Sequence, residues 1–320
     1  MEQAERDLLD RTLRQVTEAH TGAALDEALA GLGWRDALRA DARTAVALLF
    51  EHQGRAGATS SGLDDVVTAA LGVAGQADVA VVLPGLDRFA PPGTVGGDTV
   101  SVTGLATARI LQAGTALVVT TAGGGEAAAR VPAAGLGRRQ AGGMDPWMGL
   151  VEVTGAARAA APTIPLEHGR WAGAVDRARL AVGHELVGAS AAMLELACAH
   201  ARERVQFGRP IAAFQAVRHR LADALVAVDS ARALLEAAWE DGLPTTAAMA
   251  KAVSGRAGRA SARHCQQVLA GMGFTTEHPL HRYVRRVFVL DELFGSARSL
   301  TAALGREVLA GRRLPAPLPL

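Results

Sequence analysis

Two long helical patterns meet at residues 204–215, which read Arg204-Val205-Gln206-Phe207-Gly208-Arg209-Pro210-Ile211-Ala212-Ala213-Phe214-Gln215. Before this segment, an apolar stripe at helical spacing contains Leu180, Val187, Leu194 and Cys198. After it, a second stripe recurs at steps of three and four residues: Phe214, Val217, Leu221, Leu225, Val228, Ala231 and Leu235. Each stripe needs a packed neighbour, so the segment predicts a turn between two helices of a bundle.

Two further helical regions follow, at residues 248–269 and 282–309, the latter as one or two helices. Glycine and proline mark the breaks at 208–210, 241–244 and 271–273. Four long antiparallel helices form a bundle. We therefore expect a C-terminal four-helix bundle over residues 166–320.

The first half of the chain divides into two parts. Residues 2–71 are rich in Ala, Leu, Asp and Arg and predict a short helical domain. Segments 79–83, 99–103, 116–121 and 150–154 are β-branched and bounded by Gly or Pro, which is typical of strands. The expected protein is mainly α with a small β-domain: an N-terminal helical domain over 1–73, a β-domain over 74–165, and the bundle.

Composition argues against several classes of partner. The 320 residues contain 33 Lys+Arg and 32 Asp+Glu, so a formal charge of +1 attracts neither nucleic acid nor an anionic membrane. The most apolar stretch, 181–199, contains one histidine and two glutamates that lipid would leave unpaired. The start lacks the order of a secretory signal, so we expect a cytoplasmic protein. Cys198 and Cys265 have no metal-ligand spacing and are expected to be buried thiols, with no metal site.

Segment 204–215 matches R-x-Q-F-G-x-P-I-x-x-F-Q, a signature of the acyl-CoA dehydrogenase family, which the chain resembles. Residues 267–273, QVLAGMG, are similar to the family's Q-x-x-G-G-x-G, with Ala270 replacing the first glycine. The helix containing Lys251 and the spacing of the two motifs also resemble the family. The resemblance covers about residues 176–309, whereas the first half shares only the order of domains and short pieces such as 50–56.

The resemblance implies a set of contacts to FAD. By itself, Arg204 offers a planar fork to a pyrophosphate, although it would serve equally as a solvated helix-end cation, and the glycines as a helix C-cap. With the family pattern, the residues expected to contact the adenosine-diphosphate half of FAD are Arg204, Gln206, Phe207, Phe214, Gln267 and Gly271. Gly295 and Ser296, at the Gly-Thr positions of the base motif, join them as cofactor-binding residues. In the family, such contacts cross a dimer interface to a flavin held by the neighbouring subunit.

The usual catalytic base is missing. The family's reaction removes an α-proton with a carboxylate while the β-hydrogen leaves as hydride to flavin. Most members supply the glutamate of R-D-x-x-x-x-x-x-x-E-G-T, and residues 285–296 place Phe294 there. Others use L-D-x-E-R on the first bundle helix, and residues 175–179 place Ala178 there. The T-E-P-x-A-G-S-D segment and W-I-S/T strand that hold the flavin ring are not visible either.

Other carboxylates are candidates for a replacement base. Asp291 and Glu292 lie within one turn of Phe294, but the flanking leucines favour a solvated helix face. Asp64 and Asp65 are likewise expected on a solvated face. We therefore assign no catalytic residue to this chain.

A retained half-site beside a lost one resembles the smaller, base-lacking subunit of heteromeric acyl-CoA dehydrogenases of bacterial steroid degradation. Residues 279–283, PLHRY, add to that likeness. The resemblance implies a heterotetramer that catalyses FAD-dependent α,β-dehydrogenation of an acyl-CoA thioester, such as a steroid side-chain CoA, with the base on a homologous partner. Two alternatives remain open: a homo-oligomeric enzyme with an unusual base such as Glu292 or Glu185, and a flavin-free interaction or assembly protein.

Overall fold

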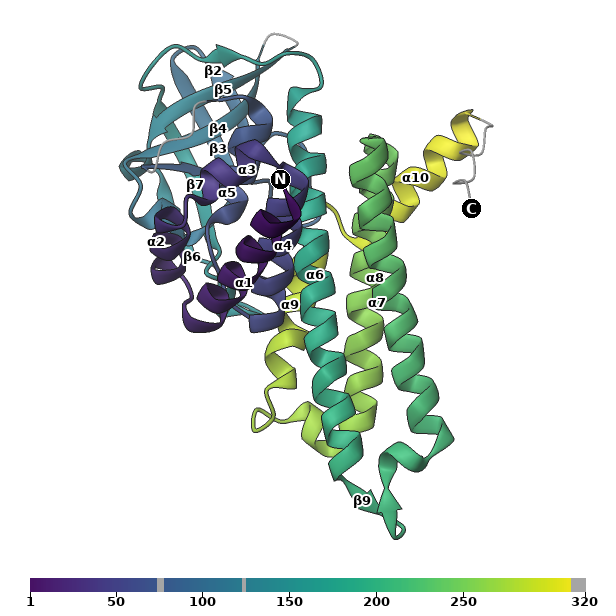
Figure 1. The fold of residues 1–320 in the computed structure, drawn as a ribbon. Coiled ribbons are helices and arrows are strands. Elements are labelled where there is room, and N and C mark those ends of the chain that lie inside the picture. The colour runs from purple at the N-terminus through teal and green to yellow at the C-terminus, as the bar shows by residue number, and fades with distance from the viewer. Residues whose placement is uncertain (74–77, 123–124, 312–320) are drawn as a thin grey trace.

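A computed structural model describes residues 1–73, 78–122 and 125–311 of the chain. Along this part of the chain come helices, then a sheet, then a helical bundle (Figure 1). This order confirms the predicted fold class, mainly α with a small β-domain. The domain boundaries after 73 and 165 stay predictions, and the first borders residues outside the described part.

The N-terminal region is a layer of helices beside the bundle. Its members are α1 (Gln3–Ala19), α2 (Ala23–Gly31), α3 (Trp34–Ala40), α4 (Ala42–Ala56) and α5 (Gly62–Leu71). Helix α4 begins where Oδ1 of Asp41 accepts a hydrogen bond from N of Thr44 at 3.1 Å. It ends at Gly57, whose φ of 64° is a left-handed conformation that glycine adopts without strain.

α4 crosses the long helix α6 (Arg170–Glu203) at two glycines. A Cβ atom on Gly54 would lie 2.2 Å from the carbonyl oxygen of Glu185, and one on Gly188 would lie 2.1 Å from that of Glu51. Neither position can carry a side chain without moving a backbone. The N-terminal layer therefore packs directly on the first bundle helix.

The β-domain is one sheet, whose strands in the described residues are β1 (Val79–Val81), β2 (Gly93–Gly96), β3 (Thr99–Ala106), β4 (Thr115–Ala122), β5 (Gly125–Pro132), β6 (Gly137–Gln140), β7 (Val151–Arg158) and β8 (Ile164–Pro165). Their order is β6-β7-β3-β2-β4-β5-β8, and β1 also pairs with β4. The pairs β1–β4 and β2–β4 are parallel and the others antiparallel. The four β-branched segments became β1, β3, β4 and β7, whereas alanine-rich β5 was not predicted.

The bundle consists of α6, α7 (Gln215–Asp241), α8 (Pro244–Leu269) and α9 (Leu280–Glu292). The last predicted region is two helices, because α10 (Ala297–Gly311) follows a break and lies on α8 (Figure 1). The predicted stripes meet inside: Val228, Ala231 and Leu235 of α7 are buried with Leu180 and Val187 of α6. The 3.6-residue period therefore identified this packed face, although Leu225 of the same predicted stripe is 48% exposed.

α6 is long and apolar enough to cross a membrane if length and composition alone are considered. However, 83% of its most apolar window is buried inside the molecule. Glu185, in the middle of the helix, accepts a hydrogen bond from Nε of Arg286 on α9 at 2.8 Å. α6 is thus the central helix of this fold.

The N-terminal layer and the β-domain are joined through Asp64 of α5, whose side chain is fully buried. Its Oδ2 accepts hydrogen bonds from Oγ1 of Thr107 at 3.0 Å and from N of Val81 at 3.4 Å. Burial raises the pKa of Asp64 to about 7, although Arg109 opposes that shift. The solvated face expected here is wrong, and it is wrong also for Asp65, which pairs with Arg109 at 2.9 Å.

Candidate functional site

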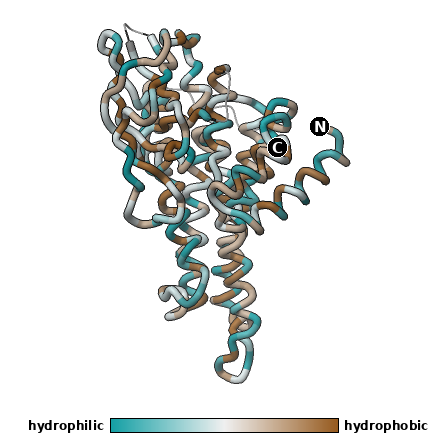
Figure 2. The backbone as a smooth tube through the Cα atoms, turned by 90° about the vertical axis from the view of Figure 1, so that its left-hand side faces the viewer, coloured by the Kyte–Doolittle hydropathy of each residue, from teal (hydrophilic) through white to brown (hydrophobic). Residues whose placement is uncertain are grey.

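The predicted turn at 204–215 is a small β-hairpin at one end of the bundle. β9 (Val205–Gln206) and β10 (Arg209–Pro210) pair antiparallel, with Phe207 and Gly208 as the turn. Both turn residues have positive φ, 55° and 75°, as a two-residue turn of type I′ requires. The hairpin forms the lower tip of the molecule in Figures 1 and 2. No strand was predicted here, because two-residue strands are too short to show an alternating pattern.

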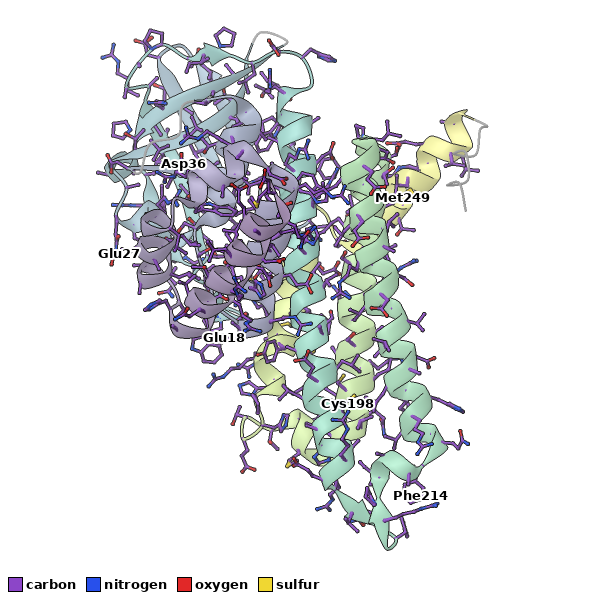
Figure 3. All side chains as sticks on the ribbon, in the orientation of Figure 1. Glu18, Glu27, Asp36, Cys198, Phe214 and Met249 are labelled. Carbon is purple, nitrogen blue, oxygen red and sulfur yellow. The ribbon has the colours of Figure 1, made fainter. Side chains whose placement is uncertain are left out.

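The tip presents aromatic rings to solvent. Phe207 is 90% exposed, and its ring meets that of Phe214 edge to face with centroids 6.1 Å apart. The guanidinium of Arg209 lies 4.4 Å from the centroid of the Phe214 ring. Figure 3 shows Phe214 beside this tip, at the opposite end of the bundle from Met249. An almost fully exposed phenylalanine with a positive φ is unusual, so this tip is a candidate binding surface.

Arg204 follows the last turn of α6 and is exposed. Its backbone closes the hairpin, since N of Ile211 donates to its carbonyl oxygen at 2.8 Å. Within the described ranges its guanidinium makes no hydrogen bond or ion pair. A free, planar fork of donors is therefore available for an anionic group.

The second motif lies at the same end of the bundle, where α8 passes into the short 3-10 helix η5 (Ala270–Phe274). Gln267 and Gly271 are exposed, and a Cβ atom on Gly271 would meet nothing within 4 Å. Ala270, which replaces the family's first glycine, has φ 52° and ψ −132°. That conformation is essentially a glycine conformation, so the backbone keeps the geometry of the motif at a cost in strain.

Gly295 and Ser296 lie elsewhere. N of Ser296 donates to Oδ1 of Asp87 at 2.8 Å, and Nζ of Lys251 donates to the carbonyl oxygen of Gly295 at 3.2 Å. Both residues are buried. About 39 Å of helix, at 1.5 Å per residue, separates Ala178, which lies near this turn, from Arg204. The structure thus brings six of the eight predicted cofactor residues to one end of the bundle and leaves these two at the other.

The two positions at which the family holds its base converge at that other end. Phe294 is 2% exposed and Ala178 is fully buried. Nε of Arg179, the neighbour of Ala178, donates to the carbonyl oxygen of Phe294 at 3.1 Å. Neither the Phe294 nor the Ala178 side chain can accept a proton. The position where the family holds its base is therefore apolar in this chain.

Asp291 is only 1% exposed, so the solvated face expected for it is wrong. Its Oδ1 accepts from N of Ala297 at 3.0 Å, and its Oδ2 pairs with Nε of Arg259. Nζ of Lys251 donates to its carbonyl oxygen at 2.9 Å, and burial lowers the pKa of Lys251 to about 8 while Asp291 opposes the shift. Both carboxylate oxygens of Asp291 therefore already have a hydrogen-bond or ion-pair partner.

The remaining candidate bases also have partners. Oε1 of Glu292 pairs with Nη2 of Arg259 at 3.1 Å, and burial followed by the nearby Asp291 raises the pKa of Glu292. Glu185 is buried between Arg286 and Gln53, whose Nε2 donates to it at 3.0 Å. Burial raises the pKa of Glu185 although Arg286 opposes it. The ion pair with Arg286 explains how Glu185 can be buried, whereas Glu292 is half-buried.

A cavity lies beside the base end of the bundle, next to the β-domain. It has a volume of about 380 Å³ and lies between the β-domain, the start of α6 and α10. Arg179 occupies one wall, with its guanidinium 5.1 Å from the centroid of the Phe89 ring. Nε1 of Trp171 fixes that loop by donating to the carbonyl oxygen of Phe89 at 2.9 Å. The lining of this cavity does not contain the T-E-P-x-A-G-S-D or W-I-S/T motifs that the family resemblance assigns to the flavin ring.

No group of three or more His, Cys, Asp or Glu side chains placed to hold a metal ion occurs among the described residues. Cys265 is buried and Cys198 half-buried, and burial raises the pKa of Cys265 to about 12. The buried thiol predicted for Cys265 is confirmed.

Comparisons with known proteins agree with this geometry. The acyl-CoA dehydrogenase C-terminal domain matches residues 170–309. The acyl-CoA dehydrogenase IpdE2 of Mycobacterium tuberculosis is 37% identical over 136 residues, which are 42% of this chain and 43% of that protein. The chain thus aligns with less than half the length of this relative.

Solved structures match over nearly the whole chain. The Tcur3481-Tcur3483 steroid ACAD G363A variant has a TM-score of 0.82 at 25% identity, covering 97% of this chain and 99% of that one. The ChsE4-ChsE5 complex from Mycobacterium tuberculosis has a TM-score of 0.76 at 22% identity, covering 99% of both chains, which shows the shared fold. Residues 170–309 thus match the acyl-CoA dehydrogenase C-terminal domain, and the described chain shares its fold with solved acyl-CoA dehydrogenase structures.

Proposed function

We propose that this chain is the base-lacking subunit of a heteromeric, FAD-dependent acyl-CoA dehydrogenase. It contributes FAD contacts to a homologous catalytic subunit, most simply within a heterotetramer, and that subunit supplies the carboxylate base. The observation that carries the proposal is the contrast between the two ends of the bundle. Arg204 is exposed and its guanidinium has no ion pair or hydrogen bond within the described residues. Phe207 is exposed beside Phe214, whereas Phe294 fills the place of the base.

The residues at the tip fit the adenosine-diphosphate half of FAD. Arg204 offers two parallel N–H donors to a pyrophosphate, and Gly271 has open space for a ligand to approach its backbone. Phe207 and Phe214 provide apolar faces beside that cation. When bound, FAD supplies the hydride acceptor of the reaction, while this chain only binds and orients the cofactor.

The opposite half of the cofactor belongs to the partner in this proposal. The cavity beside Arg179 and Phe89 lacks the family's flavin-ring motifs, and its carboxylates, Glu126, Asp176 and Glu307, do not stand at either position where the family holds its base. The proposed substrate class comes from the family and from similar structures. An acyl-CoA thioester is the substrate class of the family, and the match to a steroid ACAD supports a steroid side-chain CoA.

Colour provides the test, because bound FAD is yellow. We would express the full chain alone and together with a homologous catalytic subunit from the same genome, then measure flavin absorbance per purified complex. The proposal expects colourless protein from the single expression and yellow protein from the co-expression.

Either of the other outcomes would contradict it. Yellow protein from the single expression would favour a homo-oligomeric enzyme with an unusual base. Colourless protein in both cases, with a stable complex on size exclusion, would favour an assembly protein that binds no flavin.

A further inference from the structure

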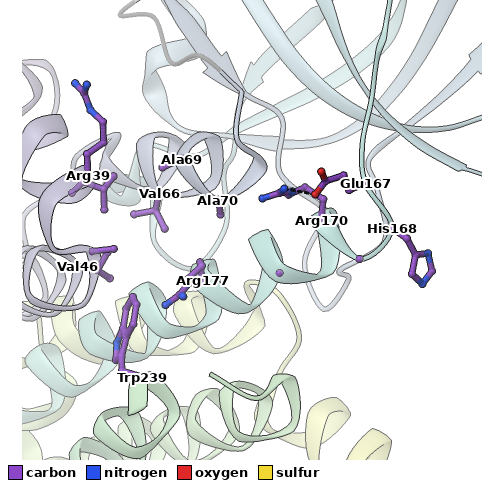
Figure 4. A pocket seen from close by; sticks show the side chains of 14 residues that line it. Arg39, Val46, Val66, Ala69, Ala70, Glu167, His168, Arg170, Arg177 and Trp239 are labelled. Atoms are coloured by element: carbon purple, nitrogen blue, oxygen red, sulfur yellow. Dashed lines mark hydrogen bonds and ion pairs between the residues drawn. The ribbon is translucent and has the colours of Figure 1, made fainter. Parts of the chain in front are cut away.

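A separate hollow lies beside the start of α6, next to the N-terminal layer (Figure 4). It has a volume of about 630 Å³ and is enclosed by α3, α4 and α5 of the N-terminal layer, the start of α6 and the end of α7. Residues Gly173 and Arg177 of α6 face it, whereas Val175 and Arg179 line the cavity beside Phe89. The volume is within the range of about 300–1,000 Å³ that is usual for small-molecule sites.

The floor of this hollow is apolar. Val46 of α4 and Val66, Ala69 and Ala70 of α5 line it, together with Leu38 of α3 (Figure 4). These are small or branched aliphatic side chains without polar atoms. A ligand that fills the hollow must therefore have an apolar body.

One side of the hollow is cationic. The guanidinium of Arg177 lies 4.5 Å from the centroid of the Trp239 ring. Arg177 makes no ion pair or hydrogen bond in the part of the chain that the structure describes. Arg170 is nearby and is neutralised by Glu167, and Arg39, on the opposite rim, pairs with Asp36. Of these three arginines, Arg177 is the one without a paired carboxylate among the described residues, although its charge acts on Asp176 and opposes the rise in pKa that burial causes in that carboxyl.

A hydrogen bond to His184 holds the Trp239 ring in position. Its Nε1 donates to Nε2 of His184 at 3.1 Å, and burial lowers the pKa of His184 to about 3, so that ring is a neutral acceptor. The indole therefore holds a constant orientation, with one face covered by Arg177. A cation stacked on a fixed aromatic ring is a preorganised anion receptor.

We infer that this hollow binds an apolar carboxylate, a molecule whose carboxylate pairs with Arg177 while its aliphatic body covers the floor made by α3, α4 and α5. The site does not involve the tip residues, so it stands or falls separately from the flavin-binding role. Neutral lipids lack the group that Arg177 would bind, and small inorganic anions lack the body that the floor would cover.

The test uses calorimetric titration of the full chain with dodecanoate below its micelle-forming concentration. Dodecanol serves as the neutral molecule with the same body, and inorganic phosphate as an anion without a body. We expect dodecanoate to bind at least about tenfold more tightly than either. Equal binding of dodecanol, or displacement of dodecanoate by millimolar phosphate, would overturn the inference.

Two variants locate the site. Arg177→Gln should weaken dodecanoate binding about tenfold, because it removes the charge-assisted pair. Gly173→Leu should abolish binding by filling the hollow, and it should not lower the melting temperature, because a Cβ atom at Gly173 meets nothing within 4 Å and leucine favours helix.

Arg256→Gln, at an exposed position on α8, is the matched control and should leave the affinity unchanged. If dodecanoate does not bind the unmodified chain, or binds all three variants as tightly, the assignment of this hollow is wrong. Flavin content of the co-expressed complex, measured in parallel, reports on the proposed function independently.

Discussion

Nε of Arg179 donates a hydrogen bond to the carbonyl oxygen of Phe294 at 3.1 Å, and this contact joins the two places where the family holds its base. Arg179 follows Ala178 on α6, whereas Phe294 lies in the turn between α9 and α10. Hydrogen bonds from Lys251 to the carbonyl oxygen of Asp291, and from N of Ala297 to the carboxylate of Asp291, stabilise that turn. The local scaffold of a catalytic turn is therefore present although both proton-accepting side chains are missing.

A carboxylate placed at this turn should not create an enzyme. Phe294 is 2% exposed and has a φ of 56°. The substitution Phe294→Glu therefore buries a carboxyl group in an apolar site. Desolvation should raise the pKa of that group, so it should be protonated. We expect a loss of stability on the order of 3 kcal/mol. We also expect no acyl-CoA-dependent bleaching of flavin absorbance when the purified variant is mixed with FAD and substrate.

The control is Phe274→Glu, because Phe274 is 71% exposed and should tolerate the change. In the assembled complex, the partner's own glutamate should carry all turnover whatever residue stands at 294. Bleaching by the Phe294→Glu chain without a partner would show that the flavin-ring half of the site is present after all.

Arg204 should determine how firmly the complex holds its flavin. Arg204→Ala removes a free guanidinium from the tip, and a charge-assisted pair is worth roughly 1.5–3 kcal/mol, so flavin retention should fall about tenfold or more. Subunit association, followed by size exclusion, should be unchanged. Arg14→Ala, on an exposed face of α1, is the matched control. An unaltered flavin dissociation constant in the Arg204→Ala complex would count against the role in trans.

Helical periodicity predicted the bundle because buried stripes repeat every turn, and α6, α7 and α8 are long enough to show several repeats. The hairpin at 205–210 was not predicted. Its two-residue strands have no repeat, and Phe207 gives no sign of its left-handed backbone. Family motifs identified the tip residues, but only the structure shows that Arg204 is left without a partner there.

Buried charges were the other failure of the sequence analysis. Asp291 follows Leu290 in a pattern that indicates an exposed face, and its burial depends on Arg259 and Lys251, which lie 32 and 40 residues earlier on another helix. Asp64 is buried for a similar reason, since its partners come from the β-domain. Long-range ion pairs of this kind leave no periodic signal.

The conformation of Ala270 predicts a stabilising substitution. At φ 52° and ψ −132° an L-residue is strained by roughly 1–3 kcal/mol, and glycine is not. Ala270→Gly should therefore raise the free energy of unfolding by about 1 kcal/mol, after allowing for the greater freedom of glycine in the unfolded chain.

Ala260→Gly provides the opposite expectation, since Ala260 lies inside α8 and glycine costs about 1 kcal/mol in a helix interior. Chemical denaturation of both variants measures the two effects. A lower stability for Ala270→Gly would mean that the methyl group makes contacts worth more than the strain.

Asp64 should make stability depend on pH between about 4 and 7. Its folded-state pKa of about 7 lies above the ordinary value of about 3.9, so its stabilising contribution is complete below pH 4 and is lost as the pH rises through 7.

Asp64→Asn cannot ionise. The free energy of unfolding of this variant minus that of the unmodified chain should therefore increase from pH 4 to pH 7, by an amount on the order of 4 kcal/mol, and then level off. Asp98→Asn, at an exposed carboxylate that pairs with Arg158, should show no increase over this range. Urea denaturation at half-unit pH intervals measures both differences, and a flat difference for Asp64→Asn would mean that the carboxyl stays ionised in the folded protein, stabilised by Arg109 and Thr107.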